Sequence, residues 1–366
     1  MIRLAISADC HVTEPFDLWT ANLPAAMRSR GPRLETREGR GCFVVEDRVI
    51  RKLPPSPEGG GQDGAAQGAP SFWRPDDAQS RLRALDQDGV WAEVMYPNVA
   101  FFCTYAIEDP ALQVATCNVY NDWLAERFGH CERFAPVGLL PVRDVGAAVA
   151  ELERLHGLGL RAALLPAHSD FRPYNDASYE PLWEAAAALG VPLSFHAGTG
   201  RSQTPAHGPG AAVVNYVTTV SGPMETVAYL CGSGALERHP ELRVGMIECG
   251  AGWLAWTLDA MDDATREHGA WVRPRLRELP SEYFRRQGFV TFQRDPVGLA
   301  NVERTGAGCL LWGSDYPHPE GTFPESRRVL EQQFRGVSQA VADRLAYANA
   351  AEIYRIPLPE GKAFPA

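Results

Sequence analysis

Long apolar segments, closely paired cysteines and an excess of positive charge are all missing from this sequence of 366 residues. No apolar run approaches the roughly 18 residues that a membrane-spanning helix requires, so we expect no membrane partner. Lysine and arginine number 35 against 45 aspartates and glutamates, and the net charge of −10 argues against a nucleic-acid partner. The chain enters a predicted strand directly after Met1, without the pattern of a signal peptide. We therefore expect a cytoplasmic protein.

None of the eight cysteines belongs to a Cys-x-x-Cys pair. In a reducing compartment such cysteines are free thiols rather than disulfides. Cys10 and Cys249 lie at the ends of predicted strands. Each either faces a site there or packs as a small buried apolar residue.

The arrangement of apolar segments predicts the fold class. An apolar fraction of 45% and a charged fraction of 22% are typical of a globular protein. Eight short apolar segments recur, many of them separated by helical stretches, at residues 2–8, 90–96, 135–140, 160–165, 191–195, 243–247, 288–292 and 309–312. Apolar strands alternating with helices indicate a covered parallel sheet, and eight of them favour a closed (β/α)8 TIM barrel over a doubly wound sheet. We expect one α/β domain over residues 1–366.

Helical periodicity between these strands is clearest over residues 76–88, 111–128, 147–156 and 179–189. An insertion over residues 41–75 separates the first two strands. Its first part, 41–52, predicts a hairpin that turns near Glu46 and Asp47. Its second part, 53–75, is rich in proline, glycine and glutamine, which predicts a mobile loop acting as a flap or an oligomer contact. We expect a surface tail over 356–366 and a homodimer or higher homo-oligomer.

Residues of metal-ligand type stand at the ends of three predicted strands. Asp9 and His11 end the first, and because they are two residues apart in extended chain they share a face. His196 ends the fifth and Asp315 follows the eighth. Parallel barrels build active sites at this end, and imidazole with carboxylate holds a divalent ion such as Zn²⁺, Mn²⁺ or Fe²⁺. The alternative, aspartates that cap turns and histidines of the core, requires a coincidence at three strand ends.

Further candidates lie at the same end of the predicted barrel. Glu248 follows the sixth strand, where it is an acid/base group, a further metal contact, or the partner of an arginine such as Arg294. Three side chains are candidates for binding substrate: Arg201, which can clamp a carboxylate, His168 after the fourth strand, and Arg294 after the seventh. For Arg201 a surface position remains an equal alternative. Trp253 forms either an aromatic wall of the site or part of the core.

These residues also carry a family resemblance. The run ISADCHVTEP at 6–15 with DLW at 17–19 resembles the opening of the decarboxylase-like branch of the amidohydrolase superfamily, typified by aminocarboxymuconate semialdehyde decarboxylase and the resorcylate decarboxylases. The likeness continues through NDWL at 121–124, HAG at 196–198, ERHP at 237–240 and WGSDYP at 312–317. It implies a (β/α)8 barrel with one divalent metal, usually zinc or manganese, held by Asp9, His11, His196 and Asp315. Zn²⁺ is the expected ion.

Two departures from the family pattern leave the reaction open. Many relatives begin with His-x-His, where this chain has Asp9 and His11, and many carry a histidine where Glu248 stands. The first hypothesis is a non-oxidative carboxy-lyase acting on a small carboxylated, often aromatic, acid, with Asp315 or Glu248 delivering a proton. The second is a hydrolase or hydratase in which a carboxylate activates a metal-bound water. The third is a non-catalytic barrel that binds a small molecule.

Overall fold

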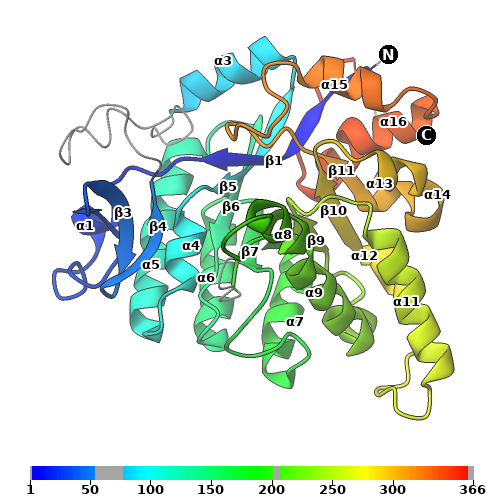
Figure 1. Ribbon diagram of the computed structural model, residues 1–366, viewed down its shortest axis with the longest axis horizontal. Helices are drawn as coiled ribbons and strands as arrows, with labels where there is room; N and C mark the ends of the chain where they lie inside the picture. The colour runs from blue at the N-terminus through cyan, green and yellow to red at the C-terminus, as the bar shows by residue number, and fades with distance from the viewer. Residues whose placement is uncertain (1, 54–76, 201–205, 362–366) are drawn as a thin grey trace.

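The computed structural model describes residues 2–53, 77–200 and 206–361. Its main sheet has eight parallel strands in chain order, wrapped into a barrel with helices outside (Figure 1). The strands are β1 Ile6–Val12, β5 Ala92–Pro97, β6 Phe134–Leu139, β7 Ala162–Pro166, β8 Leu193–His196, β9 Val244–Ile247, β10 Gly288–Phe292 and β11 Leu310–Trp312. The predicted (β/α)8 barrel is confirmed. The first strand departs most from its predicted range of 2–8, because polar residues continue β1 beyond the apolar run, whereas the limits of the other strands differ by at most two residues.

The helices that connect the strands follow the predicted periodicity. The predicted four are α3 Ala78–Asp88, α5 Pro110–Phe128, α6 Val145–Gly157 and α7 Glu180–Leu189. Aspartate side chains cap the first turns of α3, α5 and α6, and Gly190 ends α7 with a φ of 60° that only glycine adopts without strain. The other helices between β5 and β11 are α4 Ala100–Tyr105, α8 Ala211–Val217, α9 Ser221–Gly232, α10 Ala235–Arg238, α11 Leu254–Glu267, α12 Pro280–Gln287, α13 Pro296–Ala300 and α14 Val302–Thr305. No described helix is long and apolar enough to cross a membrane.

The insertion after β1 forms a small antiparallel sheet on one flank of the barrel (Figure 1). Helix α1 Leu18–Asn22 precedes it, and its strands are β2 Arg33–Arg37, β3 Arg40–Val45 and β4 Arg48–Lys52. The predicted hairpin is β3–β4, and its turn residues Glu46 and Asp47 have φ values of 47° and 67°, as a tight hairpin turn requires. Strand β2 was not predicted from the sequence. The predicted loop at 53–75 lies, apart from Leu53, outside the described residues.

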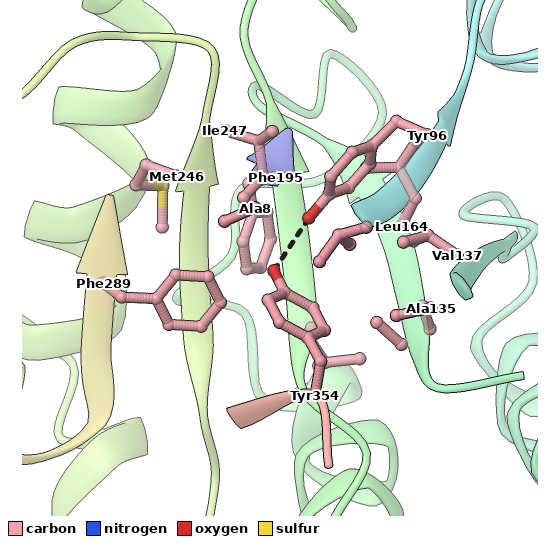
Figure 2. Close-up of a cluster of buried hydrophobic side chains, with 14 of the residues drawn as sticks. Ala8, Tyr96, Ala135, Val137, Leu164, Phe195, Met246, Ile247, Phe289 and Tyr354 are labelled. Atoms are coloured by element: carbon pink, nitrogen blue, oxygen red, sulfur yellow. Dashed lines mark hydrogen bonds between the residues drawn. The ribbon is translucent and has the colours of Figure 1, made fainter. Parts of the chain in front are cut away.

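Three helices follow β11 in the described residues: α15 Ser326–Gln333, α16 Gln339–Asp343 and α17 Asn349–Ile353. Tyr354 follows α17 and inserts among Phe195, Met246 and Phe289 in the barrel interior (Figure 2). Its hydroxyl forms a hydrogen bond of 2.9 Å with that of Tyr96, which also bonds Ser194 Oγ at 3.0 Å. The interior is therefore a packed core and not a pore. The first residues of the predicted tail, 356–361, follow this plug, and Pro357 accepts a hydrogen bond from Trp91.

We expect Tyr354→Ala to lower the free energy of unfolding by about 3–5 kcal/mol, because it removes a fully buried aromatic ring and leaves a cavity. Tyr354→Phe is the control. It keeps the ring, and Tyr96 retains Ser194 as a partner, so its cost is about 1 kcal/mol. Denaturant unfolding of both variants measures the difference. Equal stability of the two would show that the ring contributes nothing to barrel closure.

Candidate metal centre and active-site cavity

Two polar residues of β1 form the base of the site. Asp9 and His11 are both fully buried. His11 Nδ1 donates to the carbonyl oxygen of Pro97 at 2.9 Å, so Nε2 faces the cluster. Asp9 Oδ2 accepts a hydrogen bond of 3.2 Å from Thr291 on β10. Neighbouring strands thus hold both side chains in fixed orientations, as ligands of a metal require.

The remaining members come from the ends of β8, β9 and β11. His196 ends β8 and donates from Nδ1 to the carbonyl oxygen of Ala197 at 3.0 Å, so its Nε2 also faces the cluster. Glu248 and Asp315 follow β9 and β11 with φ values of 54° and 57°. Such positive values are unusual outside glycine and mark strained turns that occur at functional sites.

These side chains meet around His11 Nε2. That atom lies 3.0 Å from Glu248 Oε2, 3.3 Å from Asp315 Oδ1 and 3.9 Å from Asp9 Oδ1. His196 Nε2 lies 3.3 Å from the same Glu248 oxygen. The structure therefore brings together all four residues predicted to bind metal, and Glu248, predicted as an acid/base group, a further metal contact or an arginine partner, lies among them. In the described structure Glu248 contacts these two histidines, whereas Arg294 contacts other groups.

Glycine is required where β11 approaches β1. A Cβ atom on Gly313 would lie 2.5 Å from Cβ of Asp9, closer than such atoms ever approach. The missing side chain allows the backbone to pass directly against β1. Asp315 can then donate its N–H to the carbonyl oxygen of Asp9 at 2.8 Å.

The donor set fits a divalent cation. One ligand atom from each of Asp9, His11, His196 and Glu248 lies within 4.8 Å of the others, and the same holds for His11, Glu248, Asp315 and His318. Three buried atoms in this part of the structure lack a hydrogen-bond partner: Asp9 Oδ1, His196 Nε2 and Asp315 Oδ2. Buried polar atoms are nearly always satisfied. Three carboxylates converging with two imidazoles also call for positive charge.

The pKa shifts agree with this fit. Burial lowers the pKa of His196 to about 4, which keeps its imidazole neutral and its Nε2 lone pair available. Burial raises the pKa of Asp9 well above its usual value, and the charges of Glu248 and Asp315 raise it further. Burial disfavours protonated His11, but hydrogen bonds to Asp315 and Glu248 outweigh it and raise the pKa. Both raised pKa values reflect carboxylates crowded together without a cation, and metal binding displaces protons from its ligands.

His318 extends the cluster toward solvent. Its Nδ1 lies 2.9 Å from Asp315 Oδ1, its Nε2 lies 3.3 Å from Asn98 Oδ1, and its ring lies over that of His11 with centres 4.1 Å apart. Burial opposes ionisation of Asp315, but hydrogen bonds from His11 and His318 outweigh it and lower the pKa to about 2. Asp315 is therefore a carboxylate flanked by two imidazoles.

A cavity of about 850 Å³ opens above the cluster. Phe101 and Phe102 of α4 line one side, and Tyr216 and Val217 of α8 line another. Arg51 of β4 also lines it, with its guanidinium carbon 4.6 Å from the centre of the Phe102 ring. Burial lowers the pKa of Arg51, and the charge of Glu248 partly opposes this shift. The insertion thus supplies a cation to the cavity that no local sequence pattern indicated.

Of the residues predicted from the sequence to bind substrate, Arg294 is the described one that lines this cavity. Arg294 lines it but donates to the carbonyl oxygens of Glu320 and Gly321, at 2.9 and 3.2 Å. Trp253 packs partly buried against the core, with Nε1 bonded to the carbonyls of Cys249 and Gly250. Arg201 lies outside the described residues.

His168 follows β7 but does not join the cluster. It lines an adjacent cavity of about 700 Å³, which shares Arg51 and Tyr216 with the first. Its Nδ1 lies 2.9 Å from Glu225 and its Nε2 3.1 Å from Asp170. Both ring nitrogens are thus engaged by carboxylates away from the cluster.

An eight-stranded parallel barrel with histidines and carboxylates clustered at the carboxyl ends of its strands defines the class of metal-dependent barrel enzymes. The chain belongs to the amidohydrolase family, whose model matches residues 49–356. This confirms the resemblance inferred from the sequence. Asp9 and His11 precede the matched region, so the structure alone brings them to the site.

Similar proteins include decarboxylases. The decarboxylase orsB of Emericella nidulans is 24% identical over 296 residues, which cover 75% of this chain and 85% of the relative. The crystal structure of an amidohydrolase from Mycobacterium avium subsp. paratuberculosis K-10 superimposes with a TM-score of 0.81 at 21% identity, covering 97% of this chain and 100% of that one. A dihydroxybenzoic acid decarboxylase from Polaromonas sp. JS666, solved with manganese and the inhibitor 2-nitroresorcinol, superimposes with a TM-score of 0.65 at 20% identity, covering 98% of each chain.

Proposed function

We propose that this protein is a metal-dependent, non-oxidative decarboxylase of a small aromatic carboxylic acid. The observation that carries the proposal is the convergence of two histidines and three carboxylates at the base of a cavity whose walls hold Arg51 and two phenylalanines. The decarboxylases among the similar proteins support the reaction class.

The residues of the cavity have different proposed roles in the reaction. Asp9, His11, His196 and Asp315 would hold the cation, with Glu248 as a further contact. When bound, a divalent ion supplies positive charge that binds and polarises the substrate's carboxylate and a neighbouring oxygen. Arg51 pairs with a carboxylate through its planar fork. Phe101 and Phe102 pack against an aromatic ring.

Decarboxylation replaces a carboxylate group by hydrogen. One proton joins the carbon that bears the carboxylate, the carbon–carbon bond breaks, and its electron pair returns to the ring as CO₂ leaves. The proton comes from the pair formed by Asp315 and His318, whose contact of 2.9 Å lies in the cavity wall. The low polarity of the phenylalanine wall favours loss of a charged group.

The donor set bears on which metal binds. The sequence suggested Zn²⁺, with Mn²⁺ or Fe²⁺ as alternatives. Three carboxylates make the site rich in oxygen, which suits Mn²⁺, and the Polaromonas decarboxylase contains manganese. We therefore favour Mn²⁺ over Zn²⁺. Elemental analysis of the purified protein decides between them.

A hydrolase or hydratase is the second candidate, because Glu248 contacts both histidines and is placed to take a proton from a water molecule. Incubating the metal-loaded protein with hydroxybenzoic acids in D₂O separates the two. A decarboxylase releases CO₂ and leaves deuterium on the ring carbon. Turnover of esters or lactones without CO₂ release would favour the hydrolase. Purified protein that contains no metal and shows no turnover would favour the non-catalytic barrel.

Glu248→Gln tests the role of this carboxylate. The amide keeps the shape but cannot ionise, so we expect the metal to remain and turnover to fall by about 10²-fold if Glu248 transfers a proton. Metal content and turnover are measured on the same preparation. Near-normal turnover with full metal content would leave Asp315 as the proton carrier, and loss of metal would make Glu248 a ligand.

A homodimer is part of this proposal, because α8 exposes an apolar surface. No residue of α8 is buried, and Val213, Val214, Tyr216 and Val217 are 50–73% exposed. Exposed apolar clusters of this kind commonly mark interfaces. We expect Val213→Glu to convert a dimer into a monomer by light scattering, and Val297→Glu, at an exposed valine of α13, to leave it intact. A monomeric wild type at every concentration would refute the dimer.

The cytoplasmic location expected from the sequence stays a prediction, which cell fractionation would test.

A further inference from the structure

A buried ion pair lies beside the cluster of candidate metal ligands. Arg81 of α3 and Glu93 of β5 are each 1% exposed. The guanidinium binds the carboxylate with two hydrogen bonds, from Nε to Oε1 at 2.9 Å and from Nη2 to Oε2 at 2.7 Å. The attraction within such a pair barely offsets the cost of removing both charges from water, so stability alone does not explain it. Its role follows from what else Arg81 touches.

Arg81 contacts both chain segments that carry the cluster. Its remaining nitrogen, Nη1, donates to the carbonyl oxygen of His11 at 2.7 Å. The face of its guanidinium lies over the ring of Tyr316, with the central carbon 4.6 Å from the ring centre. Tyr316 directly follows Asp315. One planar group therefore fixes the backbone of the first segment and the side chain next to the carboxylate of the second.

These two segments share little backbone pairing. In the described residues β1 forms its ladder with β5 and β11 with β10, and a single bridge between Cys10 and Tyr316 joins the two ends of the sheet. Two backbone hydrogen bonds support this bridge, from His11 to Tyr316 at 2.7 Å and from Asp315 to Asp9 at 2.8 Å. The distance between His11 and Asp315 thus depends on a short seam, and Arg81 spans it.

We propose that Arg81, oriented by Glu93, is a positioning residue that sets the spacing of the His11 and Asp315 segments and thereby the affinity and coordination geometry of the bound metal. This inference rests on the metal site of the proposed function. The planar guanidinium is suited to the task, because it can bind a carboxylate, a carbonyl oxygen and an aromatic face at once, which a lysine cannot. Neither residue lines the cavity, so neither touches substrate.

The double substitution Arg81→Met with Glu93→Leu tests the proposal. It removes both charges together, so no unpaired buried charge remains in the metal-free fold. We expect the dissociation constant for Mn²⁺, measured by electron paramagnetic resonance, to rise about 10- to 100-fold. We also expect the visible spectrum of the Co²⁺-loaded protein to change, because it reports coordination geometry.

Arg154→Met is the matched control. Arg154 pairs at 2.7 Å with the buried Glu151 on α6, and its other contacts include no residue of the cluster. This variant loses stability but keeps the wild-type affinity for Mn²⁺. Unchanged affinity and an unchanged Co²⁺ spectrum in the double variant would overturn the proposal and leave the pair as an anchor of α3.

If the double variant does not fold, Tyr316→Leu removes the ring beneath the guanidinium and keeps the ion pair. It weakens Mn²⁺ binding several-fold if Arg81 positions the segments, and equal affinity refutes that role. A wild type that binds no Mn²⁺ refutes both the metal site and this inference. A wild type that binds Mn²⁺ but decarboxylates no aromatic acid refutes only the proposed reaction.

Discussion

Replacement of His196 by alanine is expected to reduce bound metal from about one ion per chain to a trace, because a divalent site of this type depends on each of its three or four protein ligands. His196 Nε2 faces the cluster without a hydrogen-bond partner, and its pKa of about 4 keeps that nitrogen unprotonated at neutral pH. Elemental analysis after dialysis measures the loss, and turnover falls with it.

His168→Ala is the matched control for this experiment. His168 follows the neighbouring strand β7, yet both its nitrogens face Glu225 and Asp170 and not the cluster. That variant keeps its metal. Retention of metal by His196→Ala at the wild-type stoichiometry would remove His196 from the ligand set, whatever happened to the activity.

Asp315→Asn is expected to lower turnover by about 10²- to 10⁴-fold, because the amide cannot take part in proton transfer to the substrate carbon. The carboxylate is fully buried, and His11 and His318 both contact its Oδ1 at 3.3 and 2.9 Å. Steady-state turnover, metal content and deuterium incorporation are measured together. They distinguish a lost proton path from a lost ligand.

Asp170→Asn serves as the control for Asp315→Asn. Asp170 also contacts a histidine, at 3.1 Å, but outside the cluster. Its substitution leaves turnover within a factor of about two, as expected for a polar change remote from the chemistry. Wild-type activity in Asp315→Asn would exclude Asp315 as the proton carrier and assign that role to Glu248.

Local pattern was sufficient to predict the barrel and most of the cluster. Near-continuous apolar strands identify a parallel sheet. Asp9, His11, His196 and Asp315 stand out because they are of metal-ligand type and lie at the carboxyl ends of these strands, where barrels build active sites. The limits of β1 were harder to predict, since several of its last residues are polar and a polar segment usually indicates a loop rather than a buried strand. Asp9 and His11 are buried because neighbouring strands satisfy their polar atoms with hydrogen bonds.

Arg51 and Arg81 show what local pattern cannot supply. Arg51 lies in a hairpin with several other basic residues, and only the docking of that hairpin over α4 brings it to the cavity. Arg81 lies on the buried face of α3 with Leu85 and Asp88, but its role depends on Glu93 and the carbonyl of His11, which belong to other elements. Both roles arise from contacts between distant parts of the chain.

The seam between β1 and β11 has a consequence for how the protein is made. Asp9 and His11 leave the ribosome long before Asp315 and Tyr354, which lie more than 300 residues further along the chain. Through most of translation β1 therefore exposes an unpaired edge that invites association with other chains. The cluster itself is complete only after the segment that carries Asp315 has been made and has closed against β1.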